Sequence, residues 1–193
     1  MAIGVFGCFL LQGCGRSMSE DNPYVGNMSD TSYSAQWTKK GGVYRVNALG
    51  HEVCVAVFKG KFVWADYAAP WCDPCILQAP VIRALERGLG DQIVFLTVIT
   101  SETSEFRSIP TQKTARDWAQ KFGLNPARVV IATDAWGMTI PTHILFSPTG
   151  QTLYRAKGFH SEDQIRTIMA GYIQDWRAWS EKGIVADWMT QGS

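Results

Sequence analysis

The chain has 193 residues, of which 46% are hydrophobic, and its formal net charge is +1. This length is enough for one domain with a sizeable core, and no internal repeat or low-complexity tract divides it. The near-neutral charge provides no basic stripe for nucleic acid, which argues against a nucleic-acid-binding protein. The chain has five cysteines, at positions 8, 14, 54, 72 and 75.

An apolar run, Ala2 to Leu11, leads into Leu11-Gln12-Gly13-Cys14, which resembles a bacterial lipobox. The run is too short to span a bilayer as a stable helix, so a cleaved signal peptide over residues 1–13 fits better than a transmembrane anchor. Cleavage would remove Cys8 and leave a lipid on Cys14. An unprocessed apolar segment is the alternative, because no Lys or Arg precedes the run.

Residues 14–42 are rich in Ser, Asn, Asp, Thr and Gly, which predicts a flexible tether between the lipid and a domain over residues 43–193. An apolar strand is predicted from Val53 to Phe58. Cys54 lies in this strand, where a free cysteine usually acts as a small buried hydrophobe. The alternative is a third redox thiol.

The next apolar strand, Phe62 to Tyr67, is followed by Trp71-Cys72-Asp73-Pro74-Cys75 at the start of a predicted helix. The first turn of a helix has unpaired N–H groups and the positive end of the helix dipole, so a thiolate at Cys72 is favoured. Cys72 is the expected exposed nucleophile, and Cys75, one turn inward, would resolve a mixed disulfide by attacking Cys72. Pro74 suits the first turn because its missing N–H would be unpaired there.

Two other uses of a C-x-x-C motif are disfavoured by the rest of the sequence. A c-type haem site needs His directly after the second cysteine, where this chain has Ile76. A structural zinc site would need a second C-x-x-C or paired histidines, whereas His51, His143 and His160 stand alone. We therefore expect no metal, and no cofactor beyond a redox-active Cys72–Cys75 disulfide.

A polar loop over Ser101 to Thr111 and a helix from Thr114 to Phe122 are predicted next, with Gly123 ending that helix. A hairpin is then predicted from His143–Phe146 and Gln151–Lys157. His143 is expected to be a polar residue at a strand edge, without a catalytic role.

The last predicted helix begins at an S-x-x-Q capping box formed by Ser161 and Gln164, and His160 is expected to help begin it. Six apolar residues, spaced to form one stripe, would pack on the sheet: Ile165, Ile168, Met169, Tyr172, Ile173 and Trp176. Trp176, Trp179 and Trp188 belong to an amphipathic C-terminal extension that is expected to pack onto the domain. Contact with a membrane surface or a partner is the alternative.

From about Val53 to Trp176 the chain resembles the thioredoxin superfamily. The resemblance rests on Trp71 before the first cysteine, Pro80 five residues after the second, Gly158 before the last helix, and two further matches. Asp66 matches the buried aspartate that relays protons to the inner cysteine, so burial is expected to raise its pKa. Ile140-Pro141-Thr142 matches the cis-proline segment, whose preceding backbone pairs with the substrate chain.

The resemblance implies the thioredoxin fold, an α/β fold with a central mixed sheet flanked by helices. It also implies that Cys72, Cys75 and Asp66 are catalytic and that Trp71, Ile140 and Pro141 bind substrate, while Pro74 and Pro80 are structural. The insertion between the active-site helix and the cis-proline strand is typical of TlpA- and ResA-type envelope thioredoxins. A location in the bacterial envelope, facing the periplasm, follows from that resemblance and from Cys14.

The residue after Cys72 bears on the direction of electron flow. Asp73 places a negative charge beside Cys72 and disfavours a second one, so the disulfide is expected to be weakly oxidising. The sequence therefore predicts a protein-disulfide reductase that takes electrons from a membrane donor and reduces oxidised envelope proteins, with apocytochrome c as one candidate. An oxidase or isomerase on the same scaffold, and a non-enzymatic peptide-binding module, are the alternatives.

Overall fold

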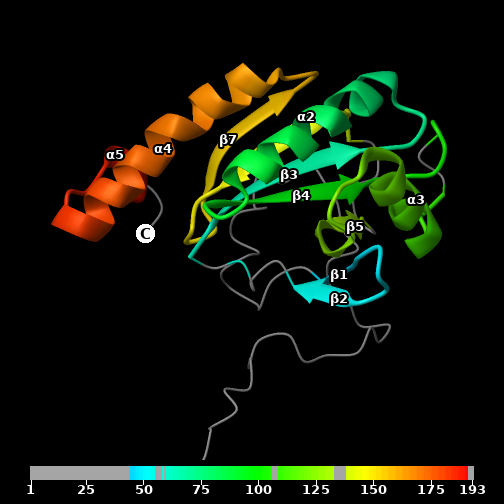
Figure 1. Ribbon diagram of the computed structural model, residues 1–193, viewed down its shortest axis with the longest axis horizontal. Coiled ribbons are helices and arrows are strands. Elements are labelled where there is room, and N and C mark those ends of the chain that lie inside the picture. Colours follow the sequence, from blue (N-terminus) through cyan, green and yellow to red (C-terminus); the bar gives the residue numbers. More distant parts are fainter. Residues whose placement is uncertain (1–43, 55–57, 59, 106–107, 133–137, 191–193) are drawn as a thin grey trace, which may run out of the picture.

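The computed structural model describes residues 44–54, 58, 60–105, 108–132 and 138–190 (Figure 1). The predicted signal peptide, the lipidation site Cys14, the tether and the side chain of Cys54 lie outside the described residues. The strands are β1 (Tyr44–Val46), β2 (Glu52–Cys54), β3 (Phe62–Ala68), β4 (Ile93–Ile99), β5 (Val129–Ile131), β6 (Thr142–Phe146) and β7 (Thr152–Lys157). The helices are α2 (Asp73–Leu89), α3 (Gln112–Phe122), η2 (Pro126–Arg128, a 3₁₀ turn), α4 (Glu162–Lys182) and α5 (Asp187–Thr190).

The sheet that carries the site has the order β5-β4-β3-β6-β7. β3 pairs in parallel with β4 and antiparallel with β6, so the sheet is mixed. Every residue of β3 and β4 is buried, which explains why both read as unbroken apolar runs rather than as alternating strands. The predicted central mixed sheet is thereby confirmed, and β3 lies in its middle.

The two faces of this sheet are covered differently. On one face, Trp64 and Phe95 belong to a core cluster with residues of α2, α3 and α4 (Figure 1). On the other face, Val63 and Leu96 belong to a second cluster, against which Val53 of β2 packs. Since Asp66 alternates in phase with Trp64 along β3, its side chain is on the helical face.

The insertion predicted between the active-site helix and the cis-proline strand is present. It comprises the loop after β4, the helix α3, the turn η2 and the short strand β5, which pairs in parallel with β4. Gly123 ends α3 in the left-handed conformation, with φ of 63°, as predicted. The insertion thus adds a helix to the face on which α2 already lies.

The capping box predicted at the start of the last helix is also present. The Ser161 hydroxyl accepts a hydrogen bond from the Gln164 amide (3.2 Å), and the Gln164 side chain accepts one from the Ser161 amide (2.8 Å). We expect Ser161→Ala to lower the free energy of unfolding by about 1 kcal/mol, because one helix N–H loses its acceptor. Urea denaturation would measure the loss, and Ser180→Ala, near the other end of α4, is the control.

Two of the three tryptophans of the C-terminal extension, Trp176 and Trp188, pack onto the domain as predicted, whereas Trp179 is 42% exposed and contacts the Trp176 ring. α4 continues without a break to Lys182, and α5 follows it. The Trp188 indole lies 6.3 Å from the Phe62 ring and 6.4 Å from that of Trp176, and its Nε1 donates to Asp175 (2.9 Å). The extension is therefore held against the end of β3 by aromatic contacts.

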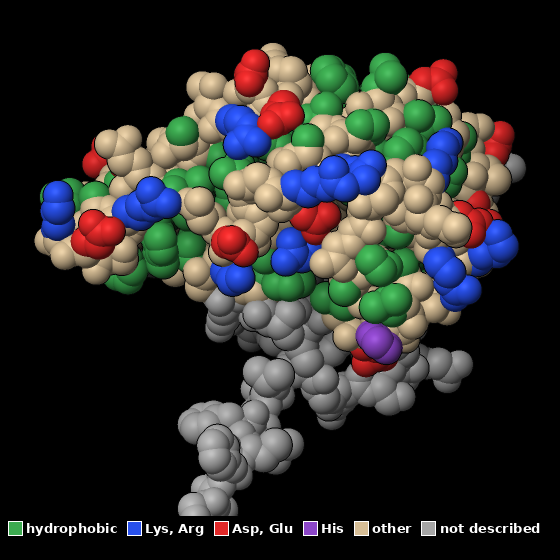
Figure 2. Space-filling model, in the orientation of Figure 1, with side chains coloured by type: hydrophobic (Ala, Val, Ile, Leu, Met, Phe, Trp, Pro, Cys, Tyr) green, Lys and Arg blue, Asp and Glu red, His purple; other side chains and the backbone are tan. Residues whose placement is uncertain are grey.

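The visible surface carries charges of both signs. Figure 2 shows acidic and basic side chains interspersed over the face formed by α2 and α4. None of the helices in the described residues combines the length and apolarity that crossing a bilayer requires.

Candidate active site

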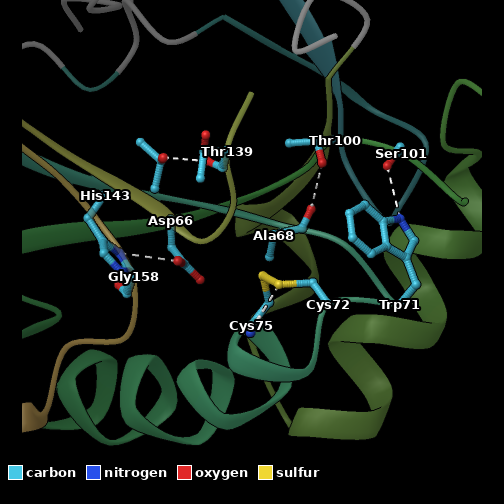
Figure 3. Close-up of a disulfide and its surroundings, with 11 residues drawn as sticks. Asp66, Ala68, Trp71, Cys72, Cys75, Thr100, Ser101, Thr139, His143 and Gly158 are labelled. Carbon is cyan, nitrogen blue, oxygen red and sulfur yellow. Dashed lines mark hydrogen bonds and ion pairs between the residues drawn. A yellow bond between two sulfur atoms is a disulfide. The ribbon is translucent and has the colours of Figure 1, made fainter. Parts of the chain in front are cut away.

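The two cysteines of the motif form a disulfide at the first turn of α2, with their Cα atoms 5.2 Å apart (Figure 3). Cys72 is the N-cap residue, and its sulfur accepts a hydrogen bond from the Cys75 amide at 3.3 Å. That donor is one of the amides that a helix start leaves unpaired, so the geometry favours a thiolate on Cys72 after reduction.

The exposed position expected for Cys72 is not observed. Its exposed fraction is 4%, and that of Cys75 is 0%. Both sulfurs belong to the core cluster on the helical face, against which Trp71 and Ile140 pack. Cys72 is still the more accessible of the two.

Trp71 connects the disulfide to the inserted loop. Its indole Nε1 donates a hydrogen bond to the Ser101 hydroxyl at 3.1 Å (Figure 3). Next to Ser101, the Thr100 amide and hydroxyl both donate to the Ala68 carbonyl, at 2.9 and 3.2 Å. The end of β4 is thus fixed beside the end of β3, where the motif begins.

Glu102 anchors the inserted loop to α3. Its carboxylate accepts hydrogen bonds from the hydroxyls of Thr114 and Thr111 and from the Thr111 amide. The hydrogen bond from Thr114, followed by that from Thr111, lowers the pKa of Glu102. Ser101 is therefore held between two fixed neighbours, and with it the orientation of Trp71.

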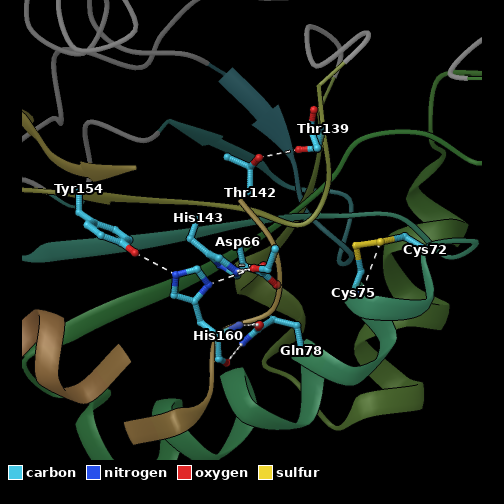
Figure 4. A network of polar contacts seen from close by, with 10 residues as sticks. Asp66, Cys72, Cys75, Gln78, Thr139, Thr142, His143, Tyr154 and His160 are labelled. Carbon is cyan, nitrogen blue, oxygen red and sulfur yellow. Dashed lines mark hydrogen bonds and ion pairs between the residues drawn. A yellow bond between two sulfur atoms is a disulfide. The ribbon is translucent and has the colours of Figure 1, made fainter. Parts of the chain in front are cut away.

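Asp66 is completely buried in the middle of β3, and burial raises its pKa from 3.8 to about 7. In Figures 3 and 4 its carboxyl lies between the His143 ring and the Cys72–Cys75 disulfide. A carboxyl that titrates near neutral pH can both accept and return a proton under physiological conditions. This environment matches the expected rise, while its relay role remains a proposal.

The Ile140–Pro141 peptide bond is cis, as the resemblance implied. The segment is fixed from both sides: Thr142 donates to the Thr139 carbonyl (2.5 Å), and the Gly158 amide donates to the Pro141 carbonyl (2.9 Å). Thr139, before this bond, is exposed. The backbone before Pro141 is thus accessible at its Thr139 end.

The prediction that His143 is a polar residue at a strand edge is wrong. β6 lies between β3 and β7, and His143, directly opposite Asp66, has an exposed fraction of 0%. Its Nδ1 is 3.2 Å from Oδ1 of Asp66. His160, expected only to help begin the last helix, is also almost buried and bonds through its ring to the Gly158 carbonyl and the Tyr154 hydroxyl (Figure 4).

Gln78 is a further residue that the sequence reasoning missed. It is completely buried on α2, donates to the His160 carbonyl (3.0 Å) and accepts from the His160 amide (2.8 Å). These two bonds join α2 to the segment before α4. A polar residue on the inward stripe of an apolar helix was the signal that could have revealed it.

Metal binding finds no support in the part of the chain that the structure describes. No group of three or more His, Cys, Asp or Glu residues there could hold a metal ion. The chemistry available at the site is that of the dithiol and of the buried groups around it.

The fold and the site thus define a protein with the thioredoxin fold that carries a C-x-x-C disulfide and a cis-proline. No protein-family model matches the chain. A curated thioredoxin of Bacillus subtilis is 36% identical over 61 residues, which is 28% of this chain and 59% of the relative. The chain spans about half the length of the curated thioredoxins that it matches at this identity.

Among solved structures, the exposed lipoprotein thioredoxin of Streptococcus pneumoniae superimposes with a TM-score of 0.54 at 21% identity, covering 66% of this chain and 98% of that one. A thioredoxin-family thiol:disulfide interchange protein of Chlorobium tepidum gives 0.57 at 18%, covering 68% and 92%. The chain is thus similar in sequence to part of known thioredoxins and has the thioredoxin fold.

Proposed function

We propose that the chain is a thiol-disulfide oxidoreductase that reduces protein disulfides in the bacterial cell envelope. The observation that supports this most directly is the Cys72–Cys75 disulfide at the start of α2, with Cys72 as the helix N-cap. Such a pair can cycle between disulfide and dithiol without any other cofactor.

In the proposed cycle the Cys72 thiolate attacks a substrate disulfide and releases one substrate sulfur as a thiolate. A mixed disulfide between Cys72 and the other substrate sulfur remains. Asp66 then takes the proton of Cys75, whose thiolate bonds to the Cys72 sulfur, and the second substrate sulfur departs with the electron pair. The substrate gains two electrons, its thiolates take up two protons, and the enzyme is left as the disulfide.

The substrate surface that we propose surrounds the cis-proline. The Gly158 amide bonds to Pro141, which places the exposed Phe159 next to this segment, and Trp71 and Ile140 are half-buried beside the disulfide. An extended peptide could add its backbone to the segment before Pro141 and place apolar side chains on these rings. Oxidised proteins with apolar residues near their disulfide are therefore the proposed substrates.

We also propose that Cys14 carries a lipid and that a membrane donor with a reduced dithiol regenerates the protein. Cys14 supports the first point by its place in a lipobox-like sequence. A lipoprotein thioredoxin of the same fold exists in Streptococcus pneumoniae. Apocytochrome c is one candidate substrate.

The equilibrium reduction potential of the Cys72–Cys75 pair tests the reductase role, by titration against glutathione or dithiothreitol. We expect a value near or below that of thioredoxin, about −270 mV. A value near that of the oxidant DsbA, about −120 mV, would make the protein an oxidase instead.

Asp73 provides a matched test of direction. It is exposed in the first turn of α2, where its charge competes with a Cys72 thiolate for the positive end of the helix. We expect Asp73→Asn to raise the reduction potential by roughly 10 to 20 mV, corresponding to about 0.5–1 kcal/mol. Asp163→Asn, the same change in the first turn of α4, should leave the potential unchanged. An equal or lower potential in Asp73→Asn would contradict the argument.

A further inference from the structure

Asp66 and His143 form a buried cross-strand pair behind the disulfide. They are register partners on β3 and β6, their side chains are 1% and 0% exposed, and Oδ1 and Nδ1 are 3.2 Å apart. Despite this short distance, neither carboxyl oxygen nor Nδ1 has an aligned hydrogen-bond partner among the described residues. Leaving these buried atoms without a hydrogen bond is costly, and a proton between Oδ1 and Nδ1 would satisfy both.

The surroundings of His143 decide which ring nitrogen carries the proton. Nε2 lies 3.0 Å from the Gly158 carbonyl oxygen, which can only accept, so Nε2 must hold a hydrogen (Figure 3). The neutral ring therefore has its lone pair on Nδ1, which faces Asp66. His160 Nδ1 approaches the same carbonyl at 3.0 Å, so its Nε2 accepts from the Tyr154 hydroxyl at 2.8 Å.

Electrostatics keep the His143 ring neutral. Burial, followed by the effect of His160, lowers the pKa of His143 from 6.5 to about 4. A carboxylate on Asp66 would then face a lone pair, and the two would repel each other. A protonated Asp66 would instead donate a hydrogen bond to Nδ1.

The other titratable groups around the pair are the Cys75 thiol on α2, His160 before α4, and Tyr154 on β7, whose pKa is raised by burial. From β4 the register partner of Asp66 is Thr97, which does not titrate. Among the described residues that face the pair, none brings a permanent charge.

We propose that His143 is a positioning residue of the redox site, whose Nδ1 lone pair holds a proton on Asp66 and so sets the pH above which Asp66 can take the proton of Cys75. The proposal rests on the proposed dithiol cycle. The proton leaves Cys75 Sγ for the Asp66 carboxylate, and the protonated carboxyl then donates to Nδ1. Resolution of the mixed disulfide should therefore speed up as Asp66 loses its proton with rising pH.

Nuclear magnetic resonance titration of the reduced full-length chain tests this without an activity measurement. With labelled histidine and aspartate, we expect His143 to show the neutral Nε2–H form from pH 5 to 8, while the Asp66 carboxyl titrates near pH 7. A His143 ring protonated on Nδ1 throughout this range would overturn the proposal. This wild-type measurement stands even if variants at position 143 fail to fold.

Two variants then measure the effect of the ring. His143→Leu removes the acceptor and should lower the Asp66 midpoint by roughly half to one pH unit, the equivalent of one hydrogen bond, while burial still keeps the pKa above its ordinary value. His143→Asn should lower it further, because its amide can donate to the carboxylate. His51→Leu, at an exposed histidine, is the control and should leave the midpoint unchanged.

The rate at which a preformed mixed disulfide on Cys72 is resolved should be measured against pH. In His143→Leu the midpoint of this rate profile should move to lower pH by the same amount as the Asp66 midpoint. An unchanged Asp66 midpoint in that variant would overturn the role of His143. If the wild type does not reduce protein disulfides but the titrations are as expected, the proposed function is wrong and the role of His143 still holds.

Discussion

Replacing Cys72 with serine is expected to lower the rate of protein-disulfide reduction by more than about a hundredfold, because a hydroxyl cannot replace the nucleophilic thiolate. Cys72 is the sulfur that accepts the Cys75 amide at the helix start and the more exposed of the pair. Reduction of insulin by dithiothreitol, followed by turbidity, measures the loss.

Cys75→Ser is the matched variant, and its expected result differs in kind. Cys72 can still attack, but the mixed disulfide cannot be resolved, so a covalent complex with the substrate should accumulate. Non-reducing electrophoresis and mass spectrometry would detect it, and Cys54→Ser should behave as the wild type. A wild type that does not reduce insulin above the background rate, with no adduct on Cys75→Ser, would favour a peptide-binding module without redox activity. A Cys72→Ser variant that reduces insulin at the wild-type rate would instead contradict the role of Cys72.

Asp66→Asn is expected to stabilise the protein at high pH while disabling the proton acceptor. The pKa of Asp66 is about 7 in the folded chain, against 3.8 for an ordinary aspartate. The folded state therefore binds this proton more tightly than the unfolded state does. Below pH 3.8 the carboxyl is protonated in both states and does not lower the free energy of unfolding. Between pH 3.8 and 7 it lowers the free energy of unfolding increasingly, and above pH 7 the loss stays constant. At pH 8 the gain from Asp66→Asn should approach about 4 kcal/mol, the equivalent of this shift.

His143 has the opposite pH dependence. Its pKa is about 4 in the folded chain and 6.5 ordinarily, so its contribution becomes more favourable as pH rises from 4 to 6.5. In the wild type, the effects of Asp66 and His143 on the free energy of unfolding oppose each other as pH rises from 4 to 6.5. In Asp66→Asn the effect of His143 remains, so the free energy of unfolding should increase over this pH range.

Urea denaturation at pH 4.5, 5.5, 6.5 and 8 would test both statements. Asp117→Asn is the control, because this exposed carboxylate pairs with the exposed Lys113 and its loss should change stability by less than about 0.5 kcal/mol. An Asp66→Asn variant no more stable than the wild type at pH 8 would contradict the expected cost of the buried carboxylate.

Local patterns were sufficient for the elements whose causes lie close together in sequence. The apolar run Phe62–Tyr67 became a central strand, and the capping box at Ser161 formed as expected. Gly123 ended α3, because a left-handed residue there suits glycine. The motif cysteines and the cis-proline were found in the same way, from spacing and resemblance.

The environment of His143 could not be predicted because it depends on sheet order. Nothing within a few residues of His143 states that β6 would lie between β3 and β7, with Asp66 opposite. The core cluster that buries Cys72 is likewise covered in part by Ile140, which comes from a distant segment of the chain. Burial of a polar group is a tertiary property, so sequence periodicity carries little information about it.

The Gly158 carbonyl accepts hydrogen bonds from both His143 and His160, and this arrangement limits proton transfer between the buried groups. A carbonyl oxygen has no proton of its own to pass on, so the chain of contacts from Tyr154 toward Asp66 is interrupted at that atom. The Gly158 carbonyl can orient the two histidine rings, but it cannot transfer a proton from one to the other. Among the described contacts, Asp66 can then exchange its proton only on the side that faces Cys72 and Cys75. Formation and reduction of the disulfide would therefore also control this proton exchange.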